Sequence, residues 1–179
     1  VKGTIAPVNR TIAVNFLTTK QAFVNQNFKI RGNVIGKFSI GMLTIDGRKI
    51  EVKKPNVELA IRNLVGKVRT DENGVMSLSG NSLSVEVGDL AFKPEPNSTV
   101  EIELEAMPLS FRLDGVEGNV AVKEASGKLT IDGGKYTASI DGEDMKLNNF
   151  LGRIELTEDG VVFDGLVSSI ALSGRINVR

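Results

Sequence analysis

The sequence predicts an all-β protein, an antiparallel sandwich or curled sheet built from two tandem copies of a similar unit with little or no helix. Three observations carry this prediction. Apolar and polar residues alternate along many short runs, which is the pattern of strands with one buried face. Asp-Gly pairs recur among these runs, and such pairs favour tight turns. Finally, GMLTIDG at 41–47 returns as GKLTIDG at 127–133, and NLVGKV at 63–68 returns as NFLGRI at 149–154, both 86 residues later. A fixed offset indicates an internal duplication.

The strands that the alternation predicts occur throughout the chain. They lie at 12–16, 43–45, 57–61, 83–87, 100–104, 120–122, 129–131, 145–147, 154–156, 170–172 and 176–178. We expect turns at the Asp-Gly pairs 46–47, 114–115, 132–133, 141–142, 159–160 and 164–165, which leaves strands of about five residues. The best helix candidate is a short one over 18–26, where Thr18 can cap the first turn.

The repeats suggest a division of the chain into an N-terminal strand and short-helix segment at 1–27, a first β repeat at 28–108 and a second at 111–179. The loop KPEPN at 93–97 and Pro108 mark breaks. The copies fit either two small domains with a linker or one merged domain over 1–179. We favour the merged domain, because each copy alone has few aromatic residues and would have a thin core.

Composition excludes several classes of function. The chain has no Cys and no His, which removes thiol chemistry, disulfides, Cys-ligated zinc and the commonest general base. Lys plus Arg and Asp plus Glu are 22 each, so the basic surplus of a nucleic-acid partner is lacking. No apolar run approaches the roughly 18 residues of a membrane span. The first residue is Val1 rather than Met, which suggests a cleaved leader or a trimmed start from which a membrane anchor was removed.

The candidates for chemistry are the acidic clusters and one Ser/Lys pairing. Asp141, Glu143 and Asp144 resemble a calcium site, but they lack the ligand spacing of a calcium loop and a solvated turn is favoured. The segments 71–74 and 158–160 read as hairpin tips, and Ser126 with Lys128 as a turn before a strand. We expect Glu101, Glu103 and Glu105 to form the solvent-exposed face of a strand. We therefore predict no catalytic, cofactor-binding or metal-binding residue and no cofactor.

One part of the second copy resembles a known class of protein. MKLNNFLGRIEL at 145–156, DGVVFDG at 159–165 and IALSGRINV at 170–178 are similar to repeats of AsmA/TamB-type and LptC-type extracytoplasmic proteins. The resemblance implies an open β-groove that carries or bridges lipids, usually behind an N-terminal membrane anchor. No functional residue is transferred by it.

These observations order the candidate functions. First comes a non-catalytic, extracytoplasmic or membrane-associated binding or scaffold module, with a lipid or another apolar ligand, or another protein, as its partner. The alternative is a structural or protein-interaction domain that uses an exposed sheet edge. A hydrolase that uses carboxylates comes third. A cytoplasmic location stays open. The Phe residues could line a lipid groove, but simple filling of the core is favoured; they are Phe23, Phe28, Phe38, Phe92, Phe111, Phe150 and Phe163.

Overall fold

The protein is all-β, as predicted, and takes the form of a curled sheet. The computed structural model describes residues 3–5, 10–16, 24–106, 110–157, 160–172 and 177–178. These residues form one 13-stranded sheet in which all the pairings are antiparallel, and they contain no α-helix. The expected helix over 18–26 lies mostly outside the described residues, since the description resumes at residue 24.

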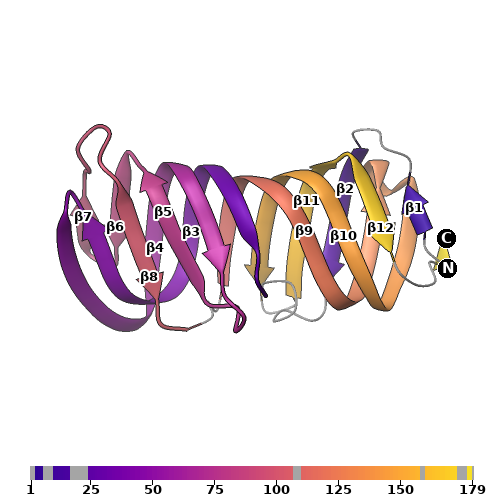
Figure 1. The fold of residues 1–179 in the computed structure, drawn as a ribbon, viewed down its shortest axis with the longest axis horizontal. Helices are drawn as coiled ribbons and strands as arrows, with labels where there is room; N and C mark the ends of the chain where they lie inside the picture. Colours follow the sequence, from indigo (N-terminus) through magenta and orange to yellow (C-terminus); the bar gives the residue numbers. More distant parts are fainter. Residues whose placement is uncertain are drawn as a thin grey trace.

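The sheet has two halves that lie end to end along the long axis of the molecule (Figure 1). The first half contains β3 (Asn27–Ile45), β4 (Arg48–Thr70), β5 (Met76–Asn81), β6 (Ser84–Val87), β7 (Leu90–Phe92) and β8 (Val100–Leu104). The second contains β9 (Ser110–Ile131), β10 (Tyr136–Thr157), β11 (Gly160–Val167) and β12 (Ser169–Leu172), together with β1 (Gly3–Ile5), β2 (Arg10–Phe16) and β13 (Asn177–Val178).

In each half, a long hairpin and two further strands pair in a closed ring. In the first half β3 pairs with β4, β4 with β5, β5 with β8, and β8 again with β3. In the second half β9 pairs with β10, β10 with β11, β11 with β2, and β2 again with β9. The N-terminal strand β2 therefore takes the place in the second ring that β8 takes in the first.

The two halves pair in corresponding registers. The pairing of β12 with β10 in the second half repeats the pairing of β6 with β4 in the first. Corresponding residues are 86 positions apart in the long strands β4 and β10, and 85 positions apart in the short strands β6 and β12. These partners are Leu59 with Val87 and Ile61 with Val85 in the first half, and Met145 with Leu172 and Leu147 with Ile170 in the second. The halves meet where β3 runs antiparallel to β9, with Ile30 opposite Val116.

The main strands are longer than the five-residue runs that the sequence predicts. The strands β3, β4, β9 and β10 have 19 to 23 residues because they bend instead of ending. Gly66 lies opposite Gly80, and a Cβ on Gly66 would collide with the carbonyl oxygen of Ser79 and lie 2.6 Å from the Cα of Gly80. Gly152 and Gly165 repeat this arrangement in the second half. These glycines let the strands approach closely where the sheet curls.

The turn predictions are confirmed in part. Asp46 and Gly47 form the β3–β4 turn with positive φ values of 51° and 76°, and a three-residue 3-10 turn at Asp132–Gly134 joins β9 to β10. The loop predicted at 93–97 connects β7 to β8. The turns predicted at 114–115, 141–142 and 164–165 are wrong, because these pairs lie inside β9, β10 and β11, the first two at register shifts in a continuing strand. Residue 159 lies outside the described part.

One apolar core runs through both halves. Among the described residues, forty apolar side chains form a single buried cluster, and the inward alternation of the long strands supplies much of it. Phe38 stacks on Phe111 at a ring-centroid distance of 6.1 Å, and Phe150 meets Phe163 edge to face at 5.6 Å. These rings fill the space inside the curl with side chains.

Candidate functional site

The interior of the described sheet offers no open groove at its aromatic residues. Phe28, Phe38, Phe111, Phe150 and Phe163 have between 0% and 3% of their surface exposed. Phe92 packs against the edge of this core, and Phe23 lies outside the described residues. The depressions at the junction of the two halves lie on the outer face of the sheet instead.

The acidic cluster of β10 caps a bulge. Oδ1 of Asp144 accepts a hydrogen bond from the backbone N–H of Glu124 at 3.1 Å, and the N–H of Gly142 donates to Oγ of Ser126 at 3.0 Å. The predicted Ser126–Lys128 turn is wrong as well, since these residues lie within β9. Across the described ranges, no group of three or more Asp or Glu residues is arranged to hold a metal ion.

Two other aspartates hold loops in place. Oδ1 of Asp71 accepts the backbone N–H groups of Asn73 and Val75 at 2.8 and 2.9 Å, which is the geometry of a hairpin tip. Asp46 accepts the N–H of Glu95 at 3.0 Å. Hydrogen bonds from the Ser98 side chain and from this N–H lower the pKa of the Asp46 carboxyl. Both carboxylates stabilise loops by accepting hydrogen bonds from backbone N–H groups.

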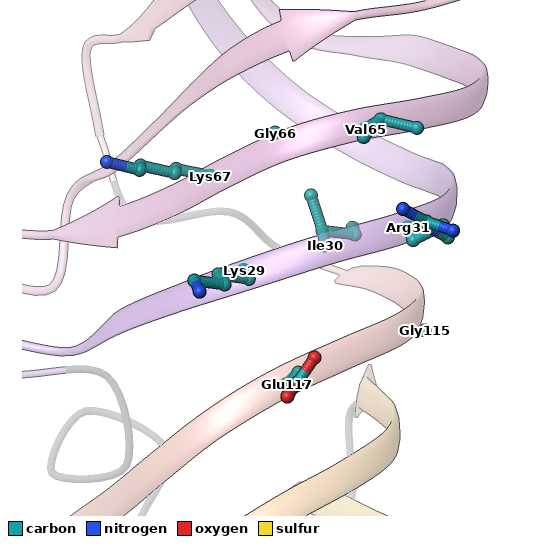
Figure 2. A pocket seen from close by; sticks show the side chains of 8 residues that line it. All are labelled: Lys29, Ile30, Arg31, Val65, Gly66, Lys67, Gly115 and Glu117. Carbon is teal, nitrogen blue, oxygen red and sulfur yellow. The ribbon is translucent and has the colours of Figure 1, made fainter.

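A concavity lies at the junction of the two halves, which we call the waist. It is a depression of about 250 Å3 between β4, β3 and β9, lined by Lys29, Ile30, Arg31, Val65, Gly66, Lys67, Gly115 and Glu117. Figure 2 shows these residues on three neighbouring ribbons, with Lys29 and Arg31 on the middle one. A second depression, of about 360 Å3, shares Lys29, Lys67 and Glu117 with the first.

Strand alternation places the cations on this surface. Phe28 and Ile30 point into the core and are 2% exposed, so Lys29 and Arg31 point outward. The Cα of Lys29 is directly opposite that of Lys67 on β4 and that of Glu117 on β9. Like charges directly opposite each other on neighbouring strands are destabilising. The waist thus carries the like charges of Lys29 and Lys67 opposite each other, with Glu117 on the other side of Lys29.

The corresponding surface of the second half is neutralised. Arg153, which follows Gly152 as Lys67 follows Gly66, has Nη2 at 3.3 Å from Oδ2 of Asp164 and Nε at 3.7 Å from Oε2 of Glu155. The register places Ser79 opposite Lys67, where Asp164 is opposite Arg153. In the described part of the chain, the ion pairs within 4.0 Å include none made by Lys29, Arg31 or Lys67.

Reading the sequence did not single out this surface. A signal is present, because Lys29-x-Arg31 and Lys67-x-Arg69 both have the spacing that puts two side chains on one face of a strand. The pairing register that brings Lys29 opposite Lys67 follows only from the fold. Glu101, Glu103 and Glu105 are exposed, as the alternation predicts.

Comparisons of the chain with known protein families, curated proteins and solved structures find no match. No helix among the described residues is long and apolar enough to cross a membrane.

Proposed function

We propose that the protein is a non-catalytic binding and scaffold module that attaches through the outer face of its waist to the acidic headgroups of a lipid membrane. One observation carries the proposal: Lys29, Arg31 and Lys67 surround a surface depression without a carboxylate within 4.0 Å of them in the described residues. A cluster of cations that the protein leaves without partners is suited to an external anion.

Apolar side chains next to the cations support a membrane as the partner. Val65 lines the depression and is 46% exposed. On the other side, Glu117 is opposite Leu151, and Leu151 is opposite Leu166, with exposures of 47% and 41%. Basic residues give electrostatic attraction to an anionic leaflet, and exposed apolar residues add contact with the headgroup region.

The test is binding to vesicles of phosphatidylcholine with and without phosphatidylserine, followed by co-sedimentation. Each Lys or Arg near an anionic surface contributes about 1 kcal/mol, so the triple variant Lys29→Gln/Arg31→Gln/Lys67→Gln should bind roughly 100-fold more weakly. The matched control removes three exposed cations from the far end of β4, as Arg48→Gln/Lys49→Gln/Lys54→Gln. Equal losses for the two triple variants would overturn the proposal.

The resemblance to lipid-bridging repeats of extracytoplasmic proteins supports a location outside the cytoplasm. We propose this location for the protein, and fractionation of the cells that produce it, with detection by antibody, tests it. Recovery only with cytosolic markers would contradict the extracytoplasmic location. The proposed attachment to acidic headgroups would survive such a result, because cytoplasmic leaflets are anionic too.

A second candidate function is interaction with another protein through a sheet edge. β7 is the last strand of the sheet path; its first residue, Leu90, is 53% exposed, and Leu83, which precedes the neighbouring strand β6, is 68% exposed. An edge of this kind can accept an added strand. Cross-linking in the producing cells, with Leu90→Lys as the variant, tests it; an unchanged cross-linking pattern would count against an edge partner.

We also propose that the two halves arose by internal duplication. The support is the common offset of the sequence repeats and of the strand registers described above. Halves that have stayed equivalent since a duplication should respond alike to substitutions at corresponding positions, and urea unfolding of paired variants such as Asn33→Ala and Asn119→Ala tests this.

A further inference from the structure

We infer that the waist depression holds one phosphate-type oxyanion between the ammonium groups of Lys29 and Lys67, with the guanidinium of Arg31 at its rim. The inference rests on the proposed attachment through this face and adds to it a discrete site and a ligand class. The shared chemistry is a phosphoryl group with at least one negative charge. Its source is either a phospholipid headgroup or a free phosphate, and the experiment below separates the two.

The cross-strand pair gives the first argument. Lys29 and Lys67 are Cα partners on adjacent strands, so their Cβ atoms are about 5 Å apart and their flexible stems reach a common point. Without a ligand the two ammonium groups repel each other. An oxyanion between them turns this repulsion into two charge-assisted hydrogen bonds. Lysine is a common phosphate ligand because its ammonium offers three donors in any direction.

The second half of the protein gives the second argument, because Arg153, the cation that corresponds to Lys67, has an acidic residue of the protein opposite it. Asp164 lies opposite Arg153, and Oδ2 of Asp164 is 3.3 Å from Nη2 of the Arg153 guanidinium. In the first half the residue opposite Lys67 is Ser79, a neutral side chain. We therefore expect an external oxyanion to take the place in the first half that the Asp164 carboxylate takes in the second, with the Ser79 hydroxyl as a further donor within reach.

The shape of the site and its acidic wall give the third argument. Gly66 and Gly115 line the depression with backbone atoms alone. Glu117 lies on the opposite wall, next to Lys29. Its carboxylate repels an anion, so the favourable position is displaced toward Lys67 and Ser79 on the β4–β5 side. A small, compact anion fits this asymmetry better than an extended polyanion, which would have to pass Glu117.

The experiment titrates the full chain with inorganic phosphate and follows backbone amides by NMR. We expect saturable shifts at residues 29–31, 65–67 and 79. Ser79→Asp installs the acid of the second half without removing any cation, and should weaken binding at least tenfold, while the neutral control Ser79→Asn keeps it. Lys67→Gln should weaken it at least fivefold. Equal phosphate affinities of Ser79→Asp and Ser79→Asn, with both variants folded by their amide spectra, would overturn the site.

Two further arms identify the source of the phosphoryl group and separate this inference from the proposed function. Binding to vesicles that contain phosphatidic acid, competed by inorganic phosphate and lost in Ser79→Asp, assigns a lipid headgroup. Saturable phosphate shifts without vesicle binding assign a free phosphate and overturn the proposed membrane attachment. Vesicle binding that the Lys29→Gln/Arg31→Gln/Lys67→Gln variant loses and Ser79→Asp retains, with no phosphate shifts, supports the attachment and overturns the discrete site.

Discussion

The backbone N–H of Asn63 donates a 3.0 Å hydrogen bond to Oδ1 of Asn33, and the N–H of Asn149 donates one of 2.9 Å to Oδ1 of Asn119. Asn63 and Asn149 have positive φ values of 52° and 54°, a conformation that asparagine tolerates better than most residues. Each bond joins the two long strands of one half at a register shift. A side chain thus supplies the acceptor that the interrupted ladder lacks.

Loss of the acceptor should have the same cost in both halves. Asn33→Ala and Asn119→Ala each leave one backbone N–H without this partner, and we expect each to lower the free energy of unfolding by about 1 kcal/mol. Asn63→Gly should be nearly neutral, because glycine adopts a positive φ without strain. Urea unfolding followed by circular dichroism measures all three. A difference of several kcal/mol between Asn33→Ala and Asn119→Ala would contradict the equivalence of the halves.

The glycines at the bends should be intolerant of any side chain. A Cβ on Gly66 or on Gly152 would collide with the backbone of the neighbouring strand, at Ser79 and Asp164. We expect Gly66→Ala and Gly152→Ala to destabilise by more than about 3 kcal/mol, because a backbone shift is required. Gly142→Ala is the control: Gly142 has a positive φ of 64°, unlike Gly66 and Gly152, but nothing lies within 4 Å of its Cβ, so about 1 kcal/mol is expected. Equal midpoints in urea for Gly66→Ala and Gly142→Ala would refute this account of the bends.

The sequence and the fold agree where local rules decide the outcome. Alternation identifies the inward residues of β3 and β9, and Asp46 with Gly47 identifies a turn. The same rule fails at Asp141 and Gly142, because a positive φ also suits a bulge inside a continuing strand, and only the partner strand distinguishes the two.

Long-range pairing decides the rest of the fold and the candidate site. The insertion of β2 between β9 and β11 joins residues more than 110 positions apart, such as Ala13 with Thr130 and with Asp164. The position of Lys29 opposite Lys67 depends in the same way on a register that several bulges reset. Periodicity within one strand carries no information about either, so the waist could not be predicted from the sequence.

The β3–β4 turn should loosen in acid. The pKa of Asp46 is lowered from its ordinary value of 3.8, chiefly by the hydrogen bond from Ser98 and then by the one from the N–H of Glu95. A lowered folded-state pKa contributes stability that is present above the ordinary pKa and is lost as pH falls through the folded value. We therefore expect protection of the Glu95 amide to fall below about pH 4. NMR of that amide during an acid titration measures the loss.

Asp46→Asn separates the charge from the hydrogen bond at this turn. Asparagine tolerates the positive φ and keeps an acceptor for the Glu95 N–H, but it does not titrate. The Glu95 amide of the variant should therefore show weaker protection at neutral pH and no change with pH at the acid transition of the wild type. The same acid transition in both proteins would assign it to another carboxylate.

Closure of the second half should depend on β2. Val14 is fully buried in β2, between β9 and β11, and Asn15 beside it is exposed. Val14→Asp places a charge in the apolar core and should release β2, whereas Asn15→Asp should be nearly silent. Hydrogen exchange should then rise at 127–131 and 161–167, the segments that β2 joins, by more than at β5 and β8. Opening confined to the second ring requires that the two halves unfold separately. A uniform rise in hydrogen exchange over both halves would contradict this expectation and show that the two rings open as one cooperative unit.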